Sequence, residues 1–174
     1  GMSLLFPMEK LFEDYVGYCL ALCLPQTYTL KKQAASLSLC KHGTKDLFKL
    51  KPDFIATTPN TSIILDAKWK LLNKAFCNEN DEEKFDKYGL SQSDFYQMFA
   101  YGHKYLPSCG QMFLIYPANE NFERDTKLAD FDFTSQQKDE TKKLKLQVMA
   151  CDWQANPQHA FPSWFKLPLD GSQP

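Results

Sequence analysis

The sequence predicts an α/β fold in which a mixed central sheet is flanked by helices, with the elements in the order helix, three strands, helix, strand. An apolar stripe at helical spacing opens the chain, and several short apolar or alternating runs follow it. A second, well-signalled helix then leads into a continuous apolar strand. The 174 residues are 44% apolar, which is enough for one packed core, so we predict a single domain over residues 1–174.

The first helix is predicted over residues 8–24. Apolar side chains recur there every three or four residues, and Pro25 ends the pattern. Glu13 falls outside this stripe, so periodicity alone places it on the solvated surface.

Three strands are predicted next, over residues 27–40, 46–57 and 61–69. The turn at residues 58–60 allows the third strand to pair with the end of the second, so we expect a meander. The polar residues 73–89 then predict an irregular excursion directly after the third strand.

The second helix has a strong start signal. Ser91 is an N-cap residue with Asp94 three positions later, as in a capping box, and Leu90 and Phe95 have the spacing of a hydrophobic staple. Its expected buried stripe is Phe95, Met98, Phe99, Gly102 and Leu106. Gln97, Tyr101 and Lys104 share a second face, where polar groups can contact a phosphate or a water molecule.

The remaining strands are less regular. Residues 111–116 predict a strand in the interior of the sheet, and residues 143–149 alternate as a half-exposed strand does. Phe131–Phe133 is a candidate edge strand. The tail from Trp153 is expected to pack against the body without regular structure.

The charge of the chain limits how it can bind nucleic acid. The net charge of −1 provides no global attraction for nucleic acid, so any DNA-binding surface must be a local cluster of lysines. Neither a secretory signal nor a membrane-spanning run is present, so we expect a soluble, cytoplasmic protein.

Gly1 before Met2 is typical of a residue left by tag cleavage. The six cysteines lack a C-x-x-C pair and are expected to be reduced, mostly in the core.

The strongest candidate site surrounds the end of the third strand. Asp66 and Lys68 are two residues apart and therefore project from the same face, while Ala67 points to the other. Strand pairing brings Asp53 beside Asp66. Two carboxylates next to a lysine suit Mg²⁺, with Mn²⁺ as a substitute, and such a metal polarises a phosphodiester while the lysine orients water. The alternative is a surface ion pair worth at most about 1 kcal/mol.

These motifs resemble a known superfamily. Pro52-Asp53, twelve residues and then Asp66-Ala67-Lys68 look like the catalytic signature of the PD-(D/E)XK nucleases, and Gln97 to Tyr101 resembles the Q-x-x-x-Y element of its RecB-like members. Further stretches are similar to the C-terminal nuclease domain of the McrC family, the endonuclease subunits of 5-methylcytosine-dependent restriction systems. They are residues 11–16, 65–70, 91–102 and 114–117.

The resemblance implies a restriction-endonuclease-like core and Mg²⁺-dependent hydrolysis of DNA. The metal ligands that it implies are acidic side chains and one backbone carbonyl: Glu13, Asp53, Asp66 and Ala67. Lys68 would position the attacking water, and Gln97 and Tyr101 would support the site. The catalytic set is then Asp53, Asp66, Lys68, Gln97 and Tyr101.

McrC-like proteins also carry an N-terminal region that docks onto McrB, a GTP-driven AAA+ ring that recognises the methylated DNA. This sequence starts at the first nuclease helix, so we expect either a domain of a longer protein that has such a partner or a stand-alone relative. The alternative is a DNA-binding or assembly module that keeps the nuclease fold without its chemistry, against which the complete D-x-K motif argues. A nuclease acting on free DNA ends or on RNA is a third reading.

Overall fold

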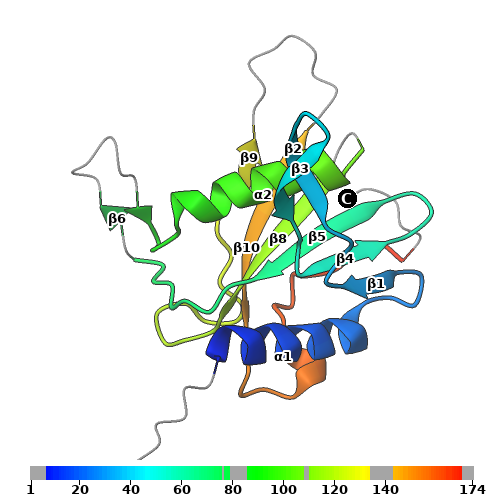
Figure 1. Cartoon of the computed structure of the whole chain (residues 1–174). Coiled ribbons are helices and arrows are strands. Elements are labelled where there is room, and N and C mark those ends of the chain that lie inside the picture. The colour runs from blue at the N-terminus through cyan, green and yellow to red at the C-terminus, as the bar shows by residue number, and fades with distance from the viewer. Residues whose placement is uncertain (1–6, 76, 79–85, 108–109, 134–142, 170–174) are drawn as a thin grey trace, which may run out of the picture.

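The computed structural model of the chain describes residues 7–75, 77–78, 86–107, 110–133 and 143–169. Its helices are α1 (Met8–Cys23) and α2 (Gln92–Tyr105), and its main strands are β1 (Thr29–Lys32), β4 (Phe54–Thr57), β5 (Ser62–Ala67), β8 (Gly110–Pro117), β9 (Phe131–Phe133) and β10 (Leu144–Cys151). The strands form one six-stranded mixed sheet in the order β1-β4-β5-β8-β10-β9, with α1 on one face and α2 on the other (Figure 1). The predicted α/β fold is therefore confirmed.

The sheet has an antiparallel part and a parallel part. β4 pairs antiparallel with both β1 and β5, whereas β5, β8 and β10 run parallel to one another and β9 closes the edge antiparallel to β10. A parallel pair needs a crossover, and α2 lies on the connection between β5 and β8. Helix α2, which follows the candidate catalytic strand β5, therefore packs over the face of the sheet that contains β5.

Two apolar cores lie on the two faces of the sheet. Leu65 packs in the core beneath α1, and Ile64 packs in the core beneath α2. Since strand side chains alternate, Asp66 comes back to the α2 face. This alternation directs the aspartate toward the second helix and away from the face of Leu65, in agreement with the predicted opposite orientation of Asp66 and Ala67.

Helix α2 lies close to the sheet at Gly102. A Cβ atom on this residue would be 2.7 Å from Leu144 Cδ1 and 2.9 Å from Met112 Sδ. A side chain there would require the buried Leu144 and Met112 side chains, or the helix itself, to shift. The glycine thus keeps the polar face of α2 within reach of β5.

The two longest predicted strands are not continuous. Residues 27–40 divide into β1 and β2 (Leu37–His42), and residues 46–57 divide into β3 (Lys45–Leu50) and β4. β2 and β3 form a separate two-stranded sheet, so the expected meander contains an inserted hairpin. The first break occurs at Gln33, which has a φ of 47° and donates its N–H to the Asp53 carbonyl at 2.7 Å. The second occurs at Pro52, which has no N–H to donate.

The other strand predictions agree more closely with the structure. Helix 8–24, the interior strand 111–116 and the edge strand Phe131–Phe133 are confirmed as α1, β8 and β9. In β10, buried and exposed residues alternate only in the first half of the strand, and the second half is buried throughout. The strand lies between β8 and β9 in the sheet. The prediction that the tail lacks regular structure is wrong at one place in its described part, where Asn156 caps the short 3₁₀ helix η1 (Pro157–His159).

The excursion at 73–89 contains the two-residue strands β6 (Cys77–Asn78) and β7 (Asp86–Lys87). Residues 76 and 79–85 of this segment lie outside the described residues.

Helix α2 begins where the sequence predicts, with Ser91 as its N-cap residue, but the side-chain hydrogen bond expected of a capping box is not formed. Ser91 makes no side-chain hydrogen bond to the helix end, and its hydroxyl lies 2.6 Å from that of Ser93 instead. Phe99, expected in the buried stripe, is 41% exposed and packs on the ring of His103. Because the capping-box contact with Ser91 is not formed, the carboxylate of Asp94 in the first turn can interact with another residue.

The cysteines that the structure describes are free thiols. Cys19 and Cys151 are buried and Cys23 is half-buried, whereas Cys40 is exposed. Three of these four thiols therefore lie in or against the core, in agreement with the prediction. Cys77 and Cys109 lie outside the residues whose side chains are described. Within the described segments, neither helix has the length and apolar character needed to cross a bilayer.

Candidate active site

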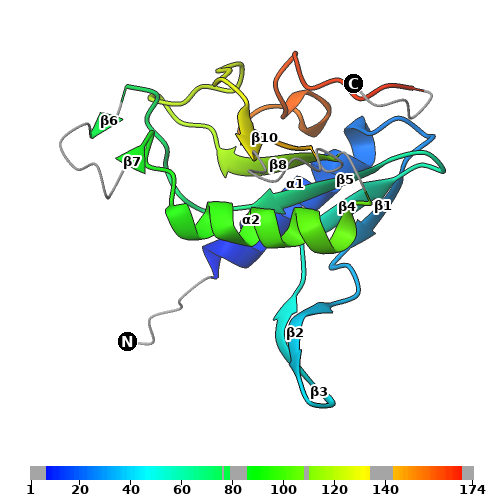
Figure 2. The same ribbon diagram turned by 90° about the horizontal axis from the view of Figure 1, so that it is seen from above.

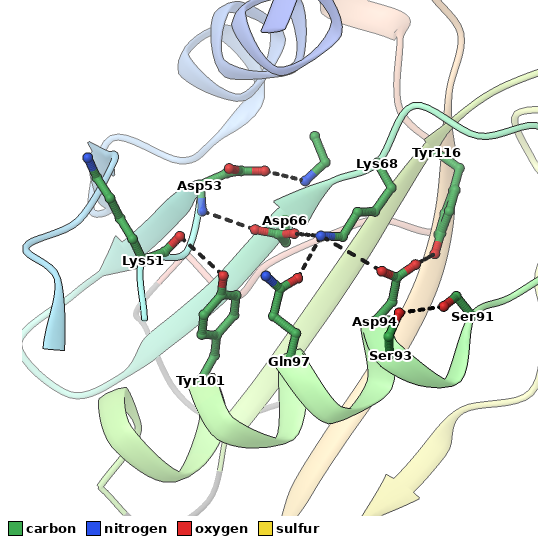
Figure 3. A network of polar contacts seen from close by, with 11 residues as sticks. Lys51, Asp53, Asp66, Lys68, Ser91, Ser93, Asp94, Gln97, Tyr101 and Tyr116 are labelled. Atoms are coloured by element: carbon green, nitrogen blue, oxygen red, sulfur yellow. Dashed lines mark hydrogen bonds and ion pairs between the residues drawn. The ribbon is translucent and has the colours of Figure 1, made fainter. Parts of the chain in front are cut away.

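The β4–β5 hairpin brings the two aspartates together. Phe54 is paired with Leu65, so Asp53 and Asp66 are the next residues on the two strands. The Asp53 N–H donates to Asp66 Oδ1 at 3.1 Å, and the Ala67 N–H donates to Asp53 Oδ2 at 2.9 Å (Figure 3). The Asp66 carboxylate is thus held by the backbone of Asp53, and the Asp53 carboxylate by the backbone of Ala67. The two aspartates lie side by side, as the turn at residues 58–60 predicted.

Lys68 lies between the strand and α2. Its Nζ atom is 2.8 Å from Asp66 Oδ2 and donates to Gln97 Oε1 at 2.6 Å (Figure 3). The Lys68 N–H donates to the Ile115 carbonyl at 2.8 Å, which anchors the residue to β8. Asp66, Lys68 and Gln97 therefore form one polar chain from β5 to α2.

The structure adds Asp94 to this chain. Its Oδ1 atom is 4.0 Å from Lys68 Nζ, and its Oδ2 atom accepts a hydrogen bond from the Tyr116 hydroxyl at 3.3 Å. Burial, together with the Asp94 charge, raises the pKa of Tyr116, which keeps its hydroxyl a donor. From the sequence, Asp94 is expected only as a capping residue. The available signal was its position three residues before Gln97, on the same helix face.

Tyr101 supports the site from one side. Its ring is buried, and its hydroxyl donates to the Lys51 carbonyl at 3.2 Å. Burial and the charges of Asp66 and Asp53 raise its pKa. Tyr101 therefore holds the segment that leads into Asp53 rather than either aspartate itself.

Glu13 is less exposed than periodicity predicted. Its side chain is only 18% exposed, accepts a hydrogen bond from Gln33 Nε2 at 3.5 Å and lies 3.6 Å from Lys10 Nζ. Its charge contributes to raising the pKa of Asp53. Glu13 thus adds negative potential near Asp53, although the hydrogen bond of its own carboxylate is with Gln33.

The electrostatics of the cluster favour a cation. Burial raises the pKa of Asp53, and the neighbouring charges of Asp66 and Glu13 raise it further, while the Ala67 N–H opposes them. For Lys68, burial lowers the pKa, but Asp66 and its hydrogen bond more than offset this, so the pKa lies above its usual value. One ammonium accordingly faces several acidic groups, and the raised pKa of Asp53 means that a second full negative charge beside Asp66 is unfavourable unless a cation offsets it.

The donor set fits a hard divalent cation. No three His, Cys, Asp or Glu side chains among the described residues form a cluster that could hold a metal by themselves. Asp53 and Asp66 nevertheless offer adjacent carboxylates, and Asp66 is only 2% exposed. Mg²⁺ is commonly bound by one or two carboxylates with water completing its shell, so this pair meets its ordinary requirement.

Asp53→Asn should stabilise the metal-free protein at neutral pH. The folded-state pKa of Asp53 lies above the unfolded value of about 3.9, so the folded state holds the proton more tightly and stability falls as pH rises above about 4. The asparagine removes this charge and can still accept the Ala67 N–H. We expect a gain on the order of 1–3 kcal/mol at pH 7, which disappears near pH 3.

Urea unfolding of both proteins at pH 3, 5 and 7, without divalent ions, measures this difference. A variant less stable than the parent chain at pH 7 would contradict it.

Comparisons with known proteins agree on one system. The family described as McrBC 5-methylcytosine restriction system component matches residues 1–117. A chain of a solved structure, the half-complex from the tetradecameric assembly of Thermococcus gammatolerans McrB AAA+ hexamers with bound McrC, is similar in fold. The TM-score is 0.53 and the identity 20%, over 84% of this chain and 28% of that chain. The present chain therefore spans less than a third of the length of that chain. No curated protein matches.

Proposed function

Since this chain belongs to the family of McrBC 5-methylcytosine restriction system components, we propose that it is a DNA endonuclease domain that uses a divalent cation, Mg²⁺ or its substitute Mn²⁺. The observation that carries this proposal is the meeting of Asp53, Asp66 and Lys68, with hydrogen bonds that fix all three. The excess of carboxylates over ammonium groups supports a metal-dependent reaction. The substrate class follows from the family.

The metal would be held by Asp53, Asp66 and the carbonyl of Ala67, with Glu13 as a candidate outer ligand. When bound, Mg²⁺ supplies Lewis acidity toward a phosphodiester oxygen and lowers the pKa of an attacking water. The raised pKa of Lys68 keeps it an ammonium at neutral pH, so we assign it a donor role: it orients the water and offsets negative charge on the phosphate.

Residues on α2 would keep this lysine in place. Gln97 accepts a hydrogen bond from the ammonium, and Asp94 adds a second anionic partner that is itself held by Tyr116. Tyr101 would fix the approach to Asp53 through Lys51. These are positioning roles, because the groups act through Lys68 or Asp53.

We further propose that the domain works in the cytoplasm with a McrB-like AAA+ GTPase ring when it is part of a longer protein. The similar solved structure is an assembly of McrB AAA+ hexamers with bound McrC, which supports this kind of partner. Recognition of methylated DNA is then assigned to the ring.

A metal titration tests the proposal without relying on activity. Mn²⁺ should raise the unfolding temperature of the parent chain, because a cation at 100 times its Kd stabilises the folded state by about 2.7 kcal/mol. The double variant Asp53→Asn/Asp66→Asn should not respond. Differential scanning calorimetry with increasing Mn²⁺ provides the measurement.

Asp132→Asn is the matched control, since it removes an exposed carboxylate on β9 and should keep the full response. An equal response in the double variant would favour the alternative, a nuclease-fold module without the chemistry.

Substrate choice is tested separately. An endonuclease should nick supercoiled circular DNA in the presence of Mg²⁺, whereas cleavage of linear DNA alone or of RNA alone would replace the proposal with an end-dependent nuclease or a ribonuclease.

A further inference from the structure

The β2–β3 hairpin extends away from the sheet, beyond α2 (Figure 2). Each strand has six residues, so the hairpin reaches about 20 Å from its root. Its returning strand ends at Leu50, three residues before Asp53. A molecule bound along the hairpin as far as its root would therefore lie beside the candidate active site.

A single hydroxyl fixes the root of this hairpin. Tyr105, the last residue of α2, places its oxygen 2.7 Å from both the Ala35 and the Leu50 carbonyls, and it accepts the Leu37 N–H at 3.1 Å. Both strands are thereby tied to the helix that carries Gln97. The hairpin is thus held in a defined position relative to the catalytic cluster.

The charge of the hairpin differs from that of the whole chain. Residues 37–51 contain four lysines and one aspartate, although the net charge of the protein is −1. The lysines are all exposed: Lys41, Lys45, Lys49 and Lys51. Asp46 lies 3.7 Å from Lys41, but both side chains are more than half exposed. The hairpin is therefore a locally basic segment, which attracts a polyanion although the whole chain does not.

Phe48 on β3 has two unfavourable features. Its side chain is 69% exposed, and its backbone has a φ of 55°, a region that bulky residues avoid. Leu39 on the paired strand is also 43% exposed. Neither feature stabilises the free protein, and strained backbone of this sort is concentrated at functional sites.

We propose that the β2–β3 hairpin is a DNA-binding arm, in which Lys41, Lys45 and Lys49 contact the phosphates of duplex substrate and Phe48 enters a groove. A two-stranded ribbon fits the major groove, and apolar side chains inserted into DNA grooves are an established mode of contact. This inference rests on the proposed nuclease function, for which it names the surface that holds the substrate. Because Leu50 at the root of the hairpin is three residues before Asp53, a duplex that lies along the length of the hairpin would reach the cleavage site.

The salt dependence of binding tests the lysines. Fluorescence anisotropy of a labelled duplex, without divalent ions, gives Kd for the whole 174-residue chain between roughly 50 and 200 mM salt. The variant Lys41→Ala/Lys45→Ala/Lys49→Ala should bind roughly tenfold more weakly or worse. The slope of log Kd against log salt should fall by about 2 to 3, because each phosphate contact contributes about 0.9.

A matched control removes the same charge elsewhere. Lys74, Lys127 and Lys166 are exposed residues outside the hairpin. Replacing these three lysines by alanine should change the slope by less than about 1.

Phe48→Gly separates binding from folding. Glycine adopts a φ of 55° without strain, so the variant should unfold at a higher temperature than the parent chain. It should nevertheless bind the duplex several-fold more weakly with an unchanged salt slope. A purely structural role for Phe48 predicts the opposite, a loss of stability with DNA affinity retained.

The experiments distinguish a DNA-binding arm that does not exist from a domain that is not a nuclease. If the parent chain nicks plasmid but the triple-lysine variant keeps the parent salt slope, the arm is overturned and the nuclease proposal stands. If the parent chain neither binds nor nicks DNA, both fail. If sedimentation shows that Phe48→Gly dissociates a dimer while DNA affinity is unchanged, the hairpin belongs to an interface between two copies and the arm is overturned.

Discussion

Asp66→Asn should abolish DNA cleavage in a protein that remains folded. The asparagine keeps the shape of the side chain and still accepts the Asp53 N–H, but it removes the carboxylate charge that the metal requires. Loss of several kcal/mol of transition-state stabilisation corresponds to at least about 10³-fold in rate. Nicking of supercoiled plasmid in Mg²⁺ measures the effect.

The control for this experiment is again Asp132→Asn, which should cleave at the parental rate. Circular dichroism of Asp66→Asn should overlay that of the parent chain. Parental cleavage by Asp66→Asn would remove the assignment of this site.

Lys68→Met should both inactivate and destabilise the protein. Asp66 is 2% exposed and Lys68 is its ion-pair partner at 2.8 Å, so the variant leaves a buried carboxylate without its counter-charge. Removing one member of such a pair costs about 3–5 kcal/mol when both are fully buried. Because the Lys68 side chain is 24% exposed, we expect about 2–4 kcal/mol, measured by urea unfolding at pH 7.

The double variant Asp66→Asn/Lys68→Met distinguishes lost pairing from lost packing. Once the carboxylate charge is absent, the methionine no longer leaves an unpaired ion, so the double variant should be more stable than Lys68→Met alone. A double variant that is equally unstable would indicate that the lysine contributes through the packing of its aliphatic chain.

Much of the candidate site could be predicted from local rules. Asp66 and Lys68 lie two residues apart at the end of a strand, so alternation alone directs both toward the same side. The turn at residues 58–60 then brings Asp53 opposite Asp66, as the register of β4 and β5 bears out. These inferences required only neighbours in the sequence or a single hairpin, which explains their accuracy.

Other features depend on contacts that no local pattern reports. Asp94 joins the cluster because α2 crosses back over β5 and because Tyr116, on a third element, holds its carboxylate. Glu13 accepts a hydrogen bond from Gln33, whose own N–H donates to the Asp53 carbonyl. Periodicity along α1 contains no information about such a neighbour.

The sequence by itself determined the class of fold, the order of its core elements and the convergence of Asp53, Asp66 and Lys68. The tertiary structure alone decided that residues 37–50 leave the sheet as a hairpin and that Asp94 faces the lysine. The physical reason is the range of the interactions: alternation and turns act over a few residues, whereas strand breaks and helix–sheet contacts are settled by hydrogen bonds between residues distant along the chain.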